Sequence, residues 1–130
     1  MRILGVDYGL KRVGLSLSDE TGVMAFPLKV LPNDKNLFNE IKLICDQENV
    51  KTIVVGDSRN NKGEENPIMK EVNKFIKGLR KNLEIKIETE PEFMTSIEAE
   101  RIQGKNDLND ASAATLILNS FLARKKHDNN

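Results

Sequence analysis

An apolar strand that ends on a single carboxylate opens this chain. Residues 3–6 are apolar, Asp7 follows at once, and a turn through Gly9 leads into a second alternating run at residues 13–17. A charge inside a sheet is costly unless it is paired, so Asp7 needs a partner. One interpretation is that its carboxylate accepts hydrogen bonds from the backbone of the following turn. The other is that it binds a divalent cation together with carboxylates from elsewhere in the chain.

The size of the chain limits its architecture to one domain. At 130 residues, of which 38% are hydrophobic, it can bury one core. We therefore expect a single domain over residues 1–124 and a polar tail over residues 125–130. Lys plus Arg and Asp plus Glu both number 20. A balanced charge argues against nucleic-acid binding through a basic tail, and leaves room for a local basic patch.

The cysteine content and the hydropathy of the chain indicate that the protein is cytoplasmic. Cys45 is the single cysteine, so no internal disulfide forms, and no Cys or His cluster offers a zinc site. The apolar run at residues 3–6 is too short for a signal peptide or a membrane span. The sequence predicts a soluble cytoplasmic protein with no membrane partner.

The periodicity predicts an α/β fold with a mixed sheet. Strands are expected at residues 2–6, 13–17, 23–31, 52–56 and 83–89. The first three are joined by short turns, which predicts an antiparallel meander, and Pro27 suits an edge strand. Leu37, Ile41, Leu43, Ile44 and Val50 carry a helical spacing from about Asn33. Further helices are expected from Pro67, from Thr95 or Ser96, and over residues 109–124.

This element order brings distant carboxylates toward one another. Asp7 ends the first strand, Glu92 lies just past the fifth, and Asp110 starts the Ala-rich final helix. Strand carboxyl ends gather at one edge of an open sheet, where ligand sites usually lie. Small residues after Asp110 allow that helix to pack closely on the sheet, near Asp7. Taken singly, Asp110 could instead be a first-turn acid favoured by the helix dipole, and Glu92 a solvated loop acid.

The chain resembles the YqgF-type pre-16S rRNA nucleases, also described as Holliday-junction-resolvase-like, of the ribonuclease H-like superfamily. The ordered set of blocks that carries the resemblance spans nearly the whole chain: residues 3–9, 11–14, 16–19, 53–56 and 60–67, Glu92, residues 95–101, 110–114 and 116–118. The resemblance implies a ribonuclease H-like fold with a five-stranded mixed sheet flanked by helices.

The resemblance also implies a site. Asp7, Glu92 and Asp110 would form an acidic triad that binds one or two Mg²⁺ or Mn²⁺ ions. The basic residues that match the pattern are candidates for phosphate contacts, or else ordinary surface charges: Lys11, Arg12, Arg59 and Arg101. Tyr8 either stacks on a base or packs against the sheet.

The implied function is a metal-dependent endonuclease that acts on structured RNA, as a monomer or homodimer, in maturation of pre-16S rRNA and with ribosomal precursor particles as partners. Branched DNA is the alternative substrate, and a catalytically weak nucleic-acid-binding ribosome-assembly factor is the alternative class. The chain departs from the family pattern in two places. Phe93 stands where an Arg is usual, and the basic segment before Asp110 is shortened to residues 102–109. Asp57 follows the fourth strand, either as an extra acid near the site or as a turn residue.

Overall fold

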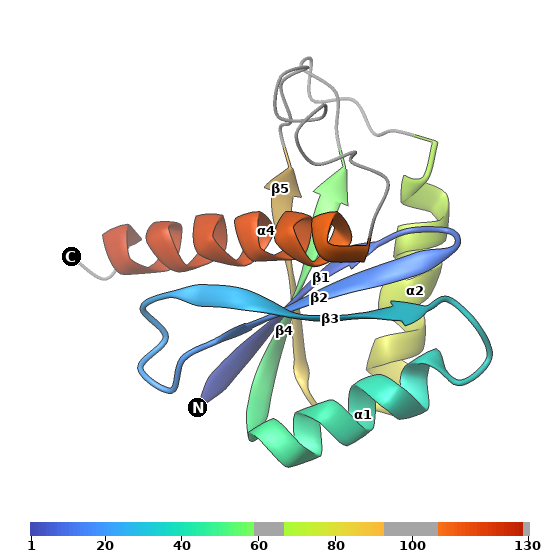
Figure 1. Ribbon diagram of the computed structural model, residues 1–130, viewed down its shortest axis with the longest axis horizontal. Coiled ribbons are helices and arrows are strands. Elements are labelled where there is room, and N and C mark those ends of the chain that lie inside the picture. The colour runs from blue at the N-terminus through green and yellow to red at the C-terminus, as the bar shows by residue number, and fades with distance from the viewer. Residues whose placement is uncertain (59–66, 93–106, 129–130) are drawn as a thin grey trace.

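Five strands and three helices make up the described part of the chain (Figure 1). The computed structural model describes residues 1–58, 67–92 and 107–128. In chain order the elements are β1 (Arg2–Tyr8), β2 (Arg12–Ser18), β3 (Ala25–Pro32), α1 (Leu37–Glu48), β4 (Val50–Ser58), α2 (Met69–Asn82), β5 (Lys86–Glu92) and α4 (Asp107–Asp128). No helix in these three segments is long and apolar enough to cross a membrane.

The strands form one mixed sheet in the order β3-β2-β1-β4-β5. β1 and β2, and β2 and β3, pair antiparallel, whereas β4 pairs parallel with both β1 and β5. The predicted meander and mixed sheet are therefore confirmed. Pro27 lies in β3, an edge strand as expected, and the register shifts between Leu15 and Ser16 of the neighbouring strand. Proline has no N–H for the ladder, so it is tolerated at this irregular edge.

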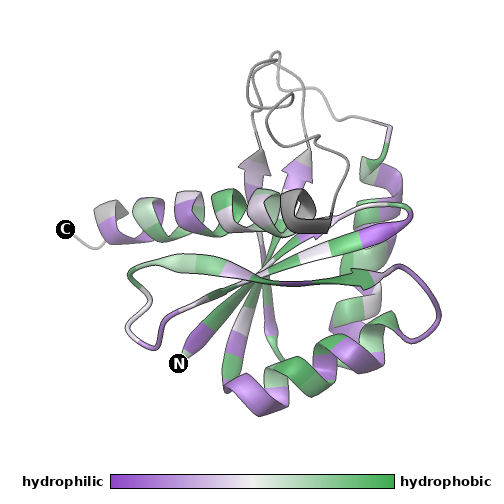
Figure 2. Ribbon diagram, in the orientation of Figure 1, coloured by the Kyte–Doolittle hydropathy of each residue, from purple (hydrophilic) through white to green (hydrophobic). Residues whose placement is uncertain are grey.

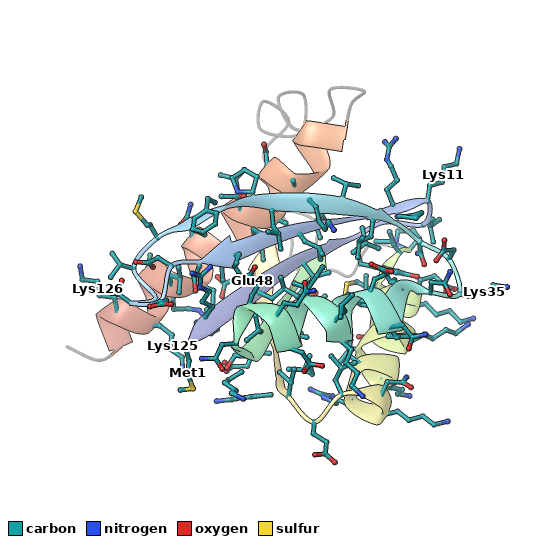
Figure 3. All side chains as sticks on the ribbon, turned by 60° about the horizontal axis from the view of Figure 1, so that its bottom comes forward. Met1, Lys11, Lys35, Glu48, Lys125 and Lys126 are labelled. Carbon is teal, nitrogen blue, oxygen red and sulfur yellow. The ribbon has the colours of Figure 1, made fainter. Side chains whose placement is uncertain are left out.

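Helices cover both faces of the sheet, and strand alternation sorts the side chains between them. Leu4 and Val6 belong to the core shared with α1 and α2. Ile3 packs instead on the cluster of Val54 with Ile117, Leu118, Phe121 and Leu122 of α4. Figure 3 shows α1 and α4 on opposite sides of the strands, and Figure 2 shows hydrophobic and hydrophilic residues alternating along α1. Odd-numbered residues of β1 therefore face α4.

Helix α1 is shorter than its spacing predicts. It begins at Leu37, because Asn33 is held by the β1–β2 turn: its backbone N–H donates to the Lys11 carbonyl (2.9 Å) and its side-chain amide to the Gly9 carbonyl (2.8 Å). It ends at Glu48, because the left-handed backbone of the next residue, Asn49 (φ 56°), stops the helix. Val50 consequently starts β4, and Leu43, expected on the buried side, is 51% exposed.

The other boundaries differ by a few residues. Helix α4 continues to Asp128, where a polar tail from residue 125 was expected. Lys125 propagates a helix well and its ammonium lies 5.8 Å from the centre of the Phe121 ring. β5 begins at Lys86 and not at Leu83, because Leu83 caps α2 with its N–H on the Leu79 carbonyl (2.8 Å). The helix expected from Thr95 or Ser96 lies outside the described residues.

Cys45 is expected to be chemically inert in the folded protein. Burial, with a smaller effect from Asp46, raises the pKa of its thiol to about 12. Because the thiolate is the nucleophile, alkylation by iodoacetamide at pH 8 should be negligible over hours and rapid in denaturant. Mass spectrometry of both reactions checks this. Rapid alkylation of the folded protein would show that α1 opens locally.

Candidate active site

Asp7 lies near the carboxyl end of the central strand. In the β1–β2 ladder it is opposite Gly14, and its neighbour Val6 is opposite Val55 of β4. Alternation places its side chain on the α4 face, with Ile3 and Gly5, and the residue is partly exposed. A carboxylate at this point is reachable from solvent yet bordered by the sheet.

Glu92 is the last residue of β5, at the same edge of the sheet. β4 lies between β1 and β5, and Ser58 at its end is opposite Glu92. Figure 1 shows the arrowheads of β4 and β5 pointing to one edge. The sequence-based condition for bringing Asp7 and Glu92 to one edge, that the fourth strand lies between or beside them, is confirmed.

The packing of α4 fixes the position of Asp110 relative to β1. A Cβ built on Gly5 would lie 2.8 Å from the Leu118 Cβ and 3.0 Å from the Ala114 carbonyl oxygen. The Ser16 hydroxyl, one strand over, donates to that same carbonyl (2.7 Å). The helix therefore crosses the sheet directly over Gly5, as the small residues of its first turns predict.

The direction of α4 follows from its next turn. Asn119 accepts a hydrogen bond from the N–H of Ala25 (3.0 Å), and Ala25 is opposite Ser18, whose hydroxyl accepts the N–H of Ile3 (2.8 Å). The helix thus runs from the Gly5 level toward the start of β1. Its N-terminal turn, with Asp110 one turn before Ala114, extends the other way, toward the end of β1 that carries Asp7.

The fold thus directs three acidic sequence positions to one edge. For Glu92 and Asp110 the structure gives only the positions in the strand and the helix, not the side chains. Their joint action with Asp7 therefore stays a prediction. Among the described side chains no group of three Asp, Glu, His or Cys residues is arranged to hold a metal. The donors at the three positions are all carboxylate oxygens, the ligands that hard divalent cations prefer.

Asp57 is neither a turn residue nor on the α4 face. It lies within β4, is 8% exposed, and is opposite Pro91. Ile53 and Val55, at the alternate positions of the strand, belong to the core under α1 and α2. Asp57 continues that alternation and falls on the face of the sheet opposite Asp7.

Two of the four basic residues proposed to contact phosphate lie in the part of the chain that the structure describes. Lys11 in the β1–β2 turn and Arg12 at the start of β2 are exposed, and Figure 3 shows Lys11 extending from one end of the molecule. Arg59 and Arg101 lie outside the described residues. Tyr8 packs on Phe75 of α2, with ring centres 4.7 Å apart, and remains partly exposed.

A buried carboxylate that the sequence did not single out connects β5 to α4. Glu90 is 4% exposed, and its two carboxylate oxygens accept hydrogen bonds from the Ser120 hydroxyl (2.9 Å) and the Arg124 Nε (2.9 Å). In the sequence it is one of several acids in an acidic stretch. The alternation along β5 indicated that Glu90 lies on the opposite face from Ile87. The burial of Glu90 could not be predicted, because it depends on α4 covering that face. The pair joins the strand that carries Glu92 to the helix that carries Asp110.

Replacing Arg124 by Met should lower the free energy of unfolding by about 2 kcal/mol, because it leaves the Glu90 carboxylate buried without its cation. This free-energy loss is smaller than that expected for a fully buried pair, because the Arg124 side chain is 52% exposed. Urea denaturation monitored by circular dichroism measures it. Arg2→Met is the matched control: it breaks the Arg2–Glu48 pair (3.2 Å) and the Arg2–Glu20 pair (3.8 Å), whose carboxylates are 37% and 80% exposed against 6% for Glu90, and should cost less than 1 kcal/mol. Equal losses in the two variants would contradict a buried-pair role for Arg124.

Comparison with solved structures defines the fold. The RuvC structure of Thermus thermophilus superposes with a TM-score of 0.60 at 12% identity, covering 98% of this chain and 97% of that one. The Fowlpox virus resolvase, in complex with Holliday junction DNA, gives 0.58 at 14% identity, covering 96% and 99%. The fold is that of the ribonuclease H-like resolvases, as predicted.

Sequence comparison identifies the family. The family described as "RuvX: Holliday junction resolvase" matches residues 1–124. A "Putative pre-16S rRNA nuclease" of Desulforudis audaxviator is 36% identical over 141 residues, covering 100% of this chain and 99% of that protein. A protein of the same name from Carboxydothermus hydrogenoformans is also 36% identical, over 135 residues, covering 96% and 98%. The chain belongs to the RuvX (YqgF) family and is a nuclease.

Proposed function

We propose that this nuclease is a metal-dependent endonuclease that cleaves structured RNA in the maturation of pre-16S rRNA, in the cytoplasm, as one domain over residues 1–124. The observation that supports it best is the crossing of α4 over Gly5. This crossing directs the helix turn with Asp110 toward the end of β1 that carries Asp7. Relatives that align over the full chain carry the pre-16S rRNA nuclease name.

The proposed catalytic residues are Asp7, Glu92 and Asp110, which would hold one or two Mg²⁺ or Mn²⁺ ions. Such ions, when bound, polarise the scissile phosphate and lower the pKa of an attacking water. Asp7 lies on the central strand of the sheet, which has a neighbour on each side. Glu92 and Asp110 belong to elements that the Glu90–Arg124 pair joins, and the same helix packs on β1 at Gly5.

Lys11 and Arg12 are proposed to contact the phosphate backbone. Both are exposed, Lys11 in the β1–β2 turn and Arg12 at the start of β2. Contacts of this kind position a nucleic acid without reading its sequence. Arg59 and Arg101 are proposed for the same role on the segments that follow β4 and β5.

Branched DNA is the second candidate substrate, because the fold is shared with resolvases, one of them in complex with Holliday junction DNA. The test is cleavage of a labelled precursor rRNA fragment and a four-way DNA junction in parallel, with Mg²⁺ or Mn²⁺ and with EDTA. Metal-dependent cutting of the RNA alone supports the proposal. Cutting of the junction alone would show that the substrate is branched DNA and not RNA. Binding of RNA without cutting of either would instead favour a ribosome-assembly factor.

A further inference from the structure

A stack of three aromatic rings reaches the surface at the end of β1. The rings of Tyr8 and Phe75 lie 4.7 Å apart and those of Phe38 and Phe75 5.8 Å apart, with interplanar angles of 16° and 17°. Phe75 is buried, whereas Tyr8 and Phe38 are half-buried. They line a cavity of about 220 Å³, together with Leu37 and with the polar side chains of Asn33, Asp34, Glu71 and Lys74. We call this cavity the aromatic pocket.

The rim of the aromatic pocket is held in place by hydrogen bonds. The Asn33 amide donates to the Gly9 carbonyl (2.8 Å), and the Asn33 backbone N–H donates to the Lys11 carbonyl (2.9 Å). The turn itself is tight: a Cβ on Gly9 would lie 2.5 Å from the Arg12 carbonyl oxygen. The segment after Tyr8 is thus fixed against the loop before α1. A pocket formed in advance of binding loses less entropy when a ligand enters.

Charged side chains of both signs border the aromatic pocket. Lys74 lines it beside the carboxylates of Asp34 and Glu71, and two further cations, Lys11 and Lys35, extend from the same end of the molecule (Figure 3). Lys74 is 64% exposed and its ammonium lies 3.7 Å from a Glu71 carboxylate oxygen. An exposed pair of this kind is weak, so Lys74 can turn to a phosphate at little cost. An aromatic surface bordered by cations is the arrangement that binds single-stranded nucleic acid.

We propose that the aromatic pocket receives an unstacked nucleobase of the bound nucleic acid, next to the phosphate at the Asp7 edge. This inference rests on the proposed function. Asp7 and Tyr8 are consecutive, so their Cα atoms are about 3.8 Å apart, and their side chains leave opposite faces of β1. A strand that crosses the end of β1 can therefore present its phosphate to one face and a neighbouring base to the other. The base stacks on the accessible parts of Tyr8 and Phe38.

The chain supplies its own probe, because Tyr8 is its only tyrosine and it has no tryptophan. Protein labelled with 3-fluorotyrosine gives one fluorine resonance, which reports on this pocket alone. The titration uses the oligonucleotides rA5 and dA5 in EDTA, so that cleavage does not compete. We expect a saturable shift of the Tyr8 resonance with rA5. An equal shift with dA5 shows that the pocket reads the base, and a shift with rA5 alone shows that the sugar contributes; both support the pocket.

Variants separate stacking from general binding. Phe38→Leu keeps an apolar side chain and removes a ring, and should weaken rA5 binding about tenfold. Phe26→Leu is the matched control: Phe26 is 41% exposed on β3, opposite Leu17 and away from the pocket, so the affinity should not change. Fluorescence anisotropy of labelled rA5 gives both affinities.

The proposal is overturned if rA5 binds while the Tyr8 resonance stays in place and Phe38→Leu leaves the affinity unchanged. Absence of rA5 and dA5 binding at millimolar concentration also overturns it. The nuclease proposal is decided separately, by the cleavage assay. If rA5 shifts the Tyr8 resonance but the protein cuts neither substrate, the base-binding pocket is supported and the proposed nuclease activity is contradicted.

Discussion

Replacing Asp7 by Asn is expected to lower the rate of phosphodiester cleavage by about 1,000-fold or more and to leave the fold intact. Asn has the shape of Asp but carries no charge, so it weakens any hard cation held at this edge and the stabilisation of charge in the transition state. The melting temperature should stay within a few degrees of wild type, or rise slightly, because one of several neighbouring negative charges is removed. Single-turnover cleavage and thermal unfolding of the same preparation measure both effects.

Asp57→Asn is the matched control for this experiment. Asp57 is also an acid close to the carboxyl end of a strand, one strand away from Asp7, but alternation places it on the opposite face of the sheet. Its cleavage rate should stay within a few-fold of wild type once any loss of folded protein is corrected for. An Asp7→Asn protein that cuts as fast as wild type would show that the site is misassigned.

The sheet could be predicted from the sequence because its signals are local. Alternation at residues 13–17 and the β-branched run at residues 52–56 each indicate a strand without reference to the rest of the chain. The element ends were less accurate, because they depend on contacts between segments. Asn33 is a good helix start by residue type, yet its hydrogen bonds to the Gly9 and Lys11 carbonyls hold it in the loop.

For the candidate site, the sequence indicates positions, and the joint role of these positions stays a prediction. The strand ends gave Asp7 and Glu92, and the resemblance to a family gave their joint role with Asp110. Glu90 could not be distinguished from the other acids nearby, because its burial depends on Ser120 and Arg124, which are at least 30 residues away. The same holds for Asp57, whose face is decided by which helices cover β4.

Gly5→Ala is expected to destabilise the structure at the point where α4 crosses the sheet. The added Cβ would lie 2.4 Å from the Ser16 Oγ, 2.8 Å from the Leu118 Cβ and 3.0 Å from the Ala114 carbonyl oxygen. The last two contacts belong to the helix, so α4 must move away from the sheet. Overpacking of this kind costs about 3 kcal/mol. For a domain of this size the melting temperature should fall by roughly 10 °C.

Two further variants test whether the steric contact is the cause. Gly22→Ala has open space around the added Cβ, and its left-handed backbone (φ 71°) should cost only about 1 kcal/mol. Ser16→Ala in the Gly5→Ala background removes the nearest contact, so the double variant should be more stable than the sum of the single losses predicts. Strict additivity in urea denaturation would contradict a direct clash.

The Gly5→Ala effect should also extend to activity. Because Ala114 lies one turn from Asp110, a shift of α4 at the crossing point changes the position of Asp110 relative to Asp7. We expect cleavage at a temperature where the variant is fully folded to fall by at least about tenfold, since catalysis is sensitive to displacements of about 1 Å. Gly22→Ala, far from the crossing point, should retain wild-type cleavage under the same conditions. A folded Gly5→Ala protein with full activity would show that the placement of α4 does not control the acidic edge.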